Sequence, residues 1–125
     1  MQPATRRYGA DMYVVNPERF EELVADALDS LPPEFGHAMK NVAVVVEDRA
    51  EGGSLFGLYQ GIPLTKRGPE SYRWVMPDRI TVYRETICQV CSTEVEVVAQ
   101  VRKTIIHEVA HHFGISDHRL AELGW

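Results

Sequence analysis

Long apolar segments and basic charge are both scarce in this sequence of 125 residues. No run of about 18 apolar residues occurs, so no segment has the composition of a membrane-spanning helix. Arg6 and Arg7 near the N-terminus are not followed by the apolar region of a secretory signal. We therefore expect a cytoplasmic protein with no membrane partner.

The shortage of basic side chains also limits the kinds of molecule that we expect the protein to bind. Lysine and arginine number 13 against 18 aspartates and glutamates, which leaves a net charge of −5 at pH 7. Affinity for nucleic acid depends on basic side chains that displace counterions from phosphates. We therefore expect no nucleic-acid partner, and consider a peptide or protein substrate or a partner protein instead.

Cysteine is limited to Cys88 and Cys91, which form a Cys-x-x-Cys pair. A structural zinc site normally takes four ligands, and the sequence holds no second pair of this kind. A thioredoxin-like redox pair would need a preceding strand and a helix that begins at the first cysteine. The simplest interpretation is two partly buried, small apolar side chains.

Length and composition are those of one ordinary globular domain. We assign residues 1–125 to a single domain, within which residues 1–13 are expected to be irregular. Asn16 and Pro17 form a typical helix start, an N-cap acceptor followed by proline at the first helical position. Apolar residues then recur every three or four positions as far as Leu31, which predicts an amphipathic helix.

Three short segments are predicted to be strands, because they are rich in β-branched residues or alternate between apolar and polar ones. These segments are residues 41–49, 55–59 and 79–84. In the last of them Ile80 and Val82 share one face, so we expect a half-buried strand. Residues 61–71 contain two prolines and two glycines and are expected to form a loop at the rim of a cleft.

A long helix is predicted toward the C-terminus. Thr93 and Glu96 have the spacing of a capping box at its start, and apolar residues recur at helical spacing as far as Phe113. Gly114 is suited to end this helix, because glycine adopts a left-handed backbone without strain. Shorter helices are expected over residues 85–91 and 117–123.

His107 and His111 lie four positions apart on the long helix. Such positions differ by about 40° in rotation and about 6 Å in height, so both imidazoles project from one face and can bind the same ion. Glu108 lies beside that face. Zinc is the favoured metal, and a site of nitrogen and oxygen donors also accepts other divalent ions.

A third ligand is expected where the chain turns back after Gly114. Asp117 follows three residues later and stands ten residues after His107. His118 is the alternative third ligand, although the register favours Asp117. His112 is rotated about 100° from His111 and is expected to be a surface residue or to contact the ligands rather than the metal.

The C-terminal segment of the sequence resembles that of a known family. The segment HEVAHHFGISDHRLAELGW, residues 107–125, is similar to the small bacterial zincin-like metallopeptidases, with the pattern HExxHxxGxxD. The resemblance extends over most of residues 14–125. It implies an α+β fold of the minimal zincin type, in which a small mixed or antiparallel sheet packs against helices and HExxH lies on a long C-terminal helix.

The same resemblance implies roles for individual residues. His107, His111 and Asp117 would bind one Zn²⁺, and Glu108 would be the catalytic acid and base for peptide-bond hydrolysis. The sequence departs from longer relatives because no methionine follows Asp117 to form a turn beneath the metal. We expect that floor to be absent or to be built from the residues Leu120, Leu123 or Trp125.

Three functions are compatible with these residues. A zinc peptidase would pair an extended substrate with an exposed sheet edge, at residues 55–59 or 79–84, and Tyr59 or Tyr83 would stabilise the oxyanion. A catalytically weak or inactive metal-binding adaptor on the same scaffold is the alternative, although a structural site needs no glutamate at Glu108. A zinc-site ribonuclease, suggested by the pair Asp117-His118, is disfavoured by the acidic net charge.

Overall fold

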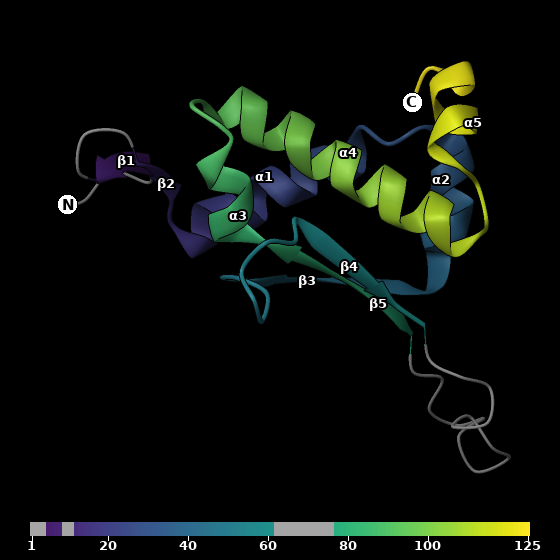
Figure 1. The fold of residues 1–125 in the computed structure, drawn as a ribbon, viewed down its shortest axis with the longest axis horizontal. Coiled ribbons are helices and arrows are strands. Elements are labelled where there is room, and N and C mark those ends of the chain that lie inside the picture. The colour runs from purple at the N-terminus through teal and green to yellow at the C-terminus, as the bar shows by residue number, and fades with distance from the viewer. Residues whose placement is uncertain (1–4, 9–11, 62–76) are drawn as a thin grey trace, which may run out of the picture.

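The structure is a computed structural model that describes residues 5–8, 12–61 and 77–125 (Figure 1). Most of the loop expected over residues 61–71 lies outside the described residues. In chain order the elements are β1 (Thr5–Tyr8), β2 (Met12–Val15), α1 (Pro17–Asp29), α2 (Pro33–Ala38), the 3-10 helix η1 (Met39–Asn41), β3 (Val42–Glu47), β4 (Gly57–Gln60), β5 (Asp78–Tyr83), α3 (Arg84–Gln89), α4 (Glu94–His112) and α5 (Asp117–Leu123). None of these helices has the length and apolar character needed to cross a membrane.

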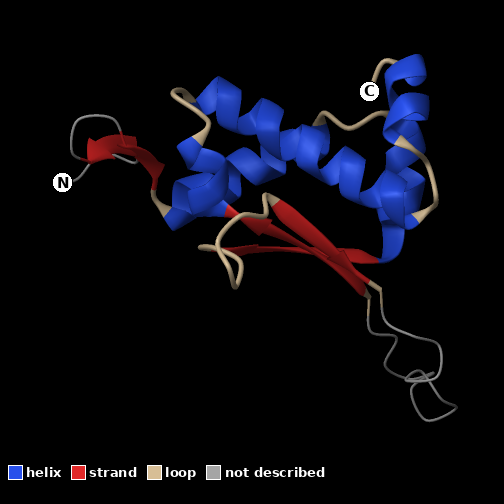
Figure 2. Ribbon diagram, viewed as in Figure 1, coloured by secondary structure: helices blue, strands red, loops and turns tan. Residues whose placement is uncertain are grey.

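The main sheet has three strands in the order β3-β5-β4. β5 runs parallel to β3 and antiparallel to β4, so the sheet is mixed. Figure 2 shows the helices gathered on one side of this sheet, with the long helix α4 running above it. The expected α+β fold, with a small sheet packed against helices and a long C-terminal helix that carries HExxH, is therefore confirmed.

β5 is the central strand, which corrects the expectation of a half-buried strand or a sheet edge at residues 79–84. Ile80 and Val82 are fully buried on one face, and Thr81 and Tyr83 are also buried on the other. A strand with a neighbour on each side loses exposure along both edges, and the sequence of β5 alone does not reveal its neighbours. Within the described residues, β4 forms an edge of the sheet, as expected for residues 55–59.

The expectation of an irregular segment over residues 1–13 was wrong for its described part. β1 and β2 pair antiparallel, with Thr5 opposite Val15 and Tyr8 opposite Met12. Tyr13, Val14 and Val15 favour an extended backbone, and the burial of Val15 attaches the hairpin to the core.

The buried side chain of Arg84 links this hairpin to the rest of the fold. Its guanidinium donates hydrogen bonds to the Val15 carbonyl at 2.8 Å and to Asp48 Oδ1 at 2.8 and 3.2 Å. Asp48 follows directly after β3, so one side chain connects β2, β3 and the start of α3.

Helix α1 begins as predicted. The Asn16 side chain accepts a hydrogen bond of 2.8 Å from the Arg19 amide, and the apolar stripe of the helix is buried in the core. The Arg19 guanidinium donates to both carboxylate oxygens of Glu94 at 2.8 and 2.9 Å, which joins α1 to the first turn of α4. This pairing lowers the pKa of Glu94. His37 lies in α2, which begins directly after Pro32.

The core lies between the sheet and the helices that cover it. It is built from the following buried side chains: Val15, Phe20, Leu23, Val24, Ala27, Phe35, Ile80, Val82, Ile87, Cys88, Cys91, Val97, Val101, Ile105, Ile106, Val109, Ala110 and Leu120. Residues of α4 contribute to this core along the helix from Val97 to Ala110, so the sheet and α1 hold the long helix in place.

Cys88 and Cys91 are buried free thiols in this core, so the prediction of small apolar residues is confirmed. Burial raises the pKa of both thiols, and that of Cys91 reaches about 11. Cys88 lies near the end of α3 rather than at a helix start, which removes the dipole that activates a redox pair.

We predict that both thiols react slowly in the folded protein. A thiol of pKa about 11 holds on the order of 10²-fold less thiolate at neutral pH than an ordinary cysteine, and only the thiolate is nucleophilic. Labelling with a disulfide-exchange reagent, with and without denaturant, measures this directly. Equally fast labelling in the two conditions would contradict the buried arrangement.

Candidate metal centre

Helix α4 is fixed at its start by a reciprocal cap. The Thr93 hydroxyl accepts a hydrogen bond of 3.2 Å from the Glu96 amide, and the Glu96 carboxylate accepts one of 2.7 Å from the Ser92 amide. The predicted capping box is therefore present, although the backbone amide that donates to the glutamate is that of Ser92 rather than that of Thr93, whose hydroxyl donates to the same carboxylate at 3.2 Å. With this start defined, the helical repeat determines which face His107 and His111 occupy about four turns later.

The end of α4 is shaped by Gly114, as predicted. Gly114 has φ +79°, and its amide donates to the His111 carbonyl at 3.0 Å. The Ile115 amide donates to the Ala110 carbonyl at 2.8 Å, which completes a Schellman motif. Ser116 then caps α5, because its hydroxyl accepts a hydrogen bond of 3.1 Å from an amide in the first turn of that helix. Asp117 thus stands at the first position of α5, turned back toward α4.

We predict that Gly114→Ala destabilises the fold by about 1 kcal/mol, because an L-residue at positive φ is strained. The substitution should also weaken metal binding, since the same turn positions Asp117. Gly36→Ala is the matched control, because a Cβ at this helical glycine has no neighbour within 4 Å and the backbone has no positive φ. Denaturant unfolding and zinc titration of both variants check this, and equal effects in both would contradict the role of the turn.

The three predicted ligands are brought together. Asp117 Oδ1 lies 3.1 Å from His107 Nδ1 and 2.8 Å from His111 Nε2, and one potential ligand atom from each residue lies within 4.8 Å of the others. The side chains of His107, His111 and Asp117 are 27%, 47% and 71% exposed, so the cluster opens to solvent. Hydrogen bonding to His111 lowers the pKa of Asp117, which favours the carboxylate.

This donor set fits a zinc ion. Ligand atoms at about 2.0–2.1 Å from a tetrahedral zinc lie about 3.3 Å from one another, and the contacts of Asp117 with His107 and His111, at 3.1 and 2.8 Å, are shorter than that separation by a few tenths of an ångström. Two imidazoles and a carboxylate leave a fourth position for water or a substrate, which is the arrangement of catalytic rather than structural zinc sites. His107, His111 and Asp117 could therefore hold one metal ion.

Glu108 follows His107 on α4, lines the same groove and contacts the sheet edge. Its Oε1 accepts a hydrogen bond of 3.1 Å from the Tyr59 amide in β4. The Tyr83 amide donates to the Phe56 carbonyl, so the alternation of an antiparallel ladder turns the Tyr59 amide away from β5. The outer edge of β4 therefore faces Glu108, over a sequence separation of 49 residues.

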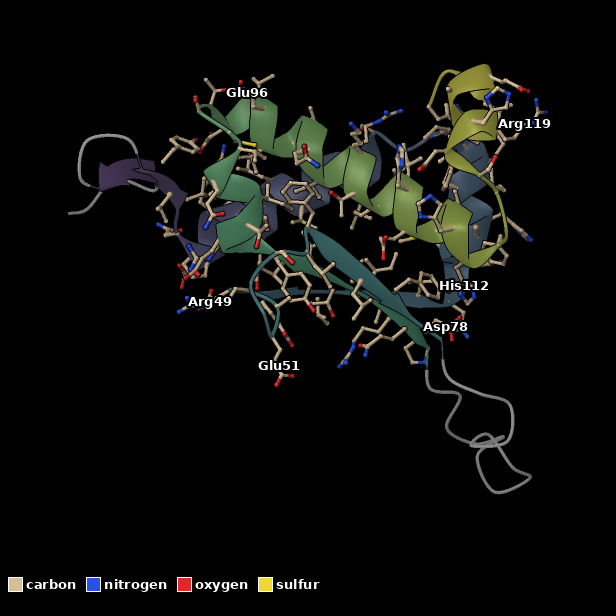
Figure 3. The ribbon with its side chains drawn as sticks, in the orientation of Figure 1. Arg49, Glu51, Asp78, Glu96, His112 and Arg119 are labelled. Carbon is tan, nitrogen blue, oxygen red and sulfur yellow. The ribbon has the colours of Figure 1, made fainter. Side chains whose placement is uncertain are left out.

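Tyr59 is held in place by two further contacts. Its ring stacks on His112, with 4.0 Å between ring centroids, and its hydroxyl donates to Asp78 Oδ2 at 2.7 Å. Figure 3 labels His112 and Asp78, which lie at the same end of the sheet, and a Cβ on Gly61 would approach both. His112 thus turns toward β4 rather than toward the other two histidines.

Two of the predicted residues are not brought to the site. His118 is 86% exposed and pairs with Glu122 at 2.8 Å, one turn farther along α5. Tyr83 lies on the opposite face of β5 from Val82, and Val82 is paired with Gly57, whose Cβ would meet Thr104 of α4. Alternation therefore directs Tyr83 away from α4 and from the metal ligands.

The residues expected to replace the methionine turn differ in their surroundings. Leu120 is fully buried in the core, whereas Leu123 is partly exposed. The Trp125 ring packs edge-on against Phe35 of α2, with 4.9 Å between centroids. These contacts attach α5 to the rest of the domain, and α5 carries Asp117.

A groove of about 340 Å³ opens next to His107 and Glu108, and sequence reasoning missed it. Its lining is formed by Ser54, Leu55, Phe56, Gly57, Gln100, Lys103, Thr104, His107 and Glu108. The residues from α4 recur at helical spacing ahead of His107, a signal that could have marked one wall. The opposite wall is the segment that leads into β4, and only long-range pairing brings it there, so no local pattern indicates it.

Comparisons with known proteins show which family the chain belongs to. The family model for zincin-like metallopeptidases matches residues 39–125, which include the main sheet, α4 and α5. Among curated proteins, none matches the chain. A solved structure of a conserved hypothetical protein from Thermus thermophilus is similar, with 27% identity and a TM-score of 0.53, over 79% of this chain and 94% of that one. The chain therefore belongs to the zincin-like metallopeptidase family.

Proposed function

We propose that the protein is a zinc-dependent peptidase that hydrolyses peptide bonds in peptides or unfolded protein segments. The observation that carries this proposal is the convergence of His107, His111 and Asp117, with Glu108 lining the same groove as His107. A purely structural metal site would need no further carboxylate at that position and would close with a fourth protein ligand. The match to the metallopeptidase family supports the same interpretation.

The chemistry follows from the side chains present. A divalent ion held by the three ligands would act as a Lewis acid that polarises the scissile carbonyl and acidifies water. Glu108 takes a proton from the water as its oxygen bonds to the carbonyl carbon. Glu108 then gives that proton to the amide nitrogen as the C–N bond breaks, so the products are one carboxylic acid and one amine.

The outer edge of β4 supports a role in holding the substrate. The backbone groups of Gly57 and Tyr59 point away from β5, so an extended peptide can pair with them as an added strand. The Tyr59 amide is engaged by Glu108 in the present structure, which holds the carboxylate at the point where such a strand would pass. Of the two tyrosines considered for the oxyanion, only Tyr59 lies on this side of the sheet.

The test is cleavage of an unfolded protein by the zinc-loaded chain. Samples with zinc, with a chelator and with zinc restored after chelation are compared by mass spectrometry of the fragments. We expect cuts with zinc, none with the chelator and recovery after zinc is restored. An unaltered substrate in the zinc-loaded sample, at protein concentrations where zinc binding is complete, would contradict the proposal and favour a metal-binding adaptor.

A further inference from the structure

We infer that the groove beside His107 and Glu108 is a substrate subsite that takes a residue bearing a carboxylate, with Lys103 as the residue that determines this specificity. This inference rests on the proposed peptidase function, because it assigns the substrate class of the same site. It concerns either an acidic side chain or the C-terminal carboxylate of a peptide, which present the same charged group.

The position of Lys103 on α4 places it in line with the metal ligands. Lys103 precedes His107 by four residues, so the two share a helix face and differ by about 6 Å in height. Both residues line the same groove. An extended peptide advances about 3.3 Å per residue, so a group that reaches Lys103 lies about two residues from the scissile bond.

The charge of Lys103 is not paired within the part of the chain that the structure describes. The side chain is exposed, and in residues 5–8, 12–61 and 77–125 it has no acidic partner. Among the described residues of the groove lining, the acidic side chain is that of Glu108, which already accepts a hydrogen bond from the Tyr59 amide. In a chain with a net charge of −5, the positive charge of Lys103 at the groove favours an anionic group there.

The remaining walls suit the apolar part of a peptide. Leu55 is 43% exposed at the groove, although large apolar side chains are usually covered, and Phe56 is half-buried next to it. Gly57 lets α4 approach β4 closely, because a Cβ there would lie 2.6 Å from Thr104 Cγ2. A volume of about 340 Å³ accommodates one or two side chains, not a folded partner.

The experiment uses short peptides of one apolar sequence, blocked at the N-terminus, that differ in a single group. One pair exchanges glutamate for glutamine inside the peptide, and a second pair exchanges the free C-terminal carboxylate for an amide. Cleavage is measured as kcat/KM with zinc, and binding is measured by fluorescence anisotropy on chelator-treated protein. We expect the carboxylate member of at least one pair to be favoured by about five- to tenfold in both measurements.

The variants test whether Lys103 causes that preference. Lys103→Met should reduce the ratio to about one. Lys103→Glu should instead favour the lysine member of a third peptide pair, which exchanges lysine for glutamine. Lys40→Met is the matched control, since Lys40 is an exposed lysine of η1 outside the groove lining, and it should leave the ratio unchanged. The ratio is measured within each variant, so a general loss of activity does not affect it.

The outcomes separate this inference from the proposed function. Binding with a Lys103-dependent preference but no cleavage would support the subsite and overturn the peptidase. Cleavage of both members of each pair at equal rates by the wild type would overturn the subsite and leave the peptidase standing. A preference that persists in Lys103→Met would also overturn the subsite.

Discussion

Replacing Glu108 by glutamine should nearly abolish peptide hydrolysis while zinc binding stays at the wild-type level. Glutamine has the shape of glutamate, and its side-chain carbonyl can still accept the hydrogen bond from the Tyr59 amide. It cannot take a proton from water, and the loss of a general base costs about 10²–10⁴-fold in rate. The kcat of purified wild type and variant on one fluorogenic peptide, together with the zinc content of each, tests this prediction.

Glu21→Gln is the control for this measurement, because Glu21 is an exposed carboxylate on α1 and is remote in sequence from the site. It should retain wild-type activity and zinc content. Cleavage by Glu108→Gln at the wild-type rate would exclude Glu108 as the acid and base. Loss of zinc in Glu108→Gln would instead show that the carboxylate belongs to the ligand set.

Zinc should raise the thermal unfolding midpoint of the wild type, and His111→Ala should lose most of this gain. A ligand at 100 times its dissociation constant adds about 2.7 kcal/mol to the unfolding free energy. For a domain of 125 residues this corresponds to a rise on the order of 10 °C. Differential scanning calorimetry with and without zinc measures the rise.

The His111→Ala variant separates metal binding from core packing, because the His111 side chain is 47% exposed and contributes little to the core. The unfolding midpoints of wild type and His111→Ala should therefore be similar without metal and separate only when zinc is added. His118→Ala, which removes another imidazole from the same region, should keep the full gain. An equal rise in all three proteins would mean that zinc acts elsewhere.

The convergence of His107, His111 and Asp117 could be predicted because short-range signals determine its geometry. The start of α4 is set by Thr93 and Glu96, and its end by Gly114, all within a few residues of the atoms that they bond. Between these points the helical repeat brings His107 and His111 to one face. No long-range pairing is needed to bring Asp117 back to them.

Contacts between distant segments could not be predicted in the same way. The order of the strands depends on which edges meet, so the central position of β5 and the burial of Tyr83 were missed. The hydrogen bond from Tyr59 to Glu108 spans 49 residues and has no local signature. The groove has the same origin, because one wall is α4 and the other is the segment that leads into β4.

The proposed binding of one cation by His107, His111 and Asp117 is tested most directly by the zinc content of protein purified without added metal and dialysed against metal-free buffer. We expect about one zinc per chain in the wild type and in His118→Ala, and a loss of most of it in Asp117→Ala. Full zinc content in Asp117→Ala, or a wild type that takes up no zinc when titrated, would contradict this assignment of the metal centre.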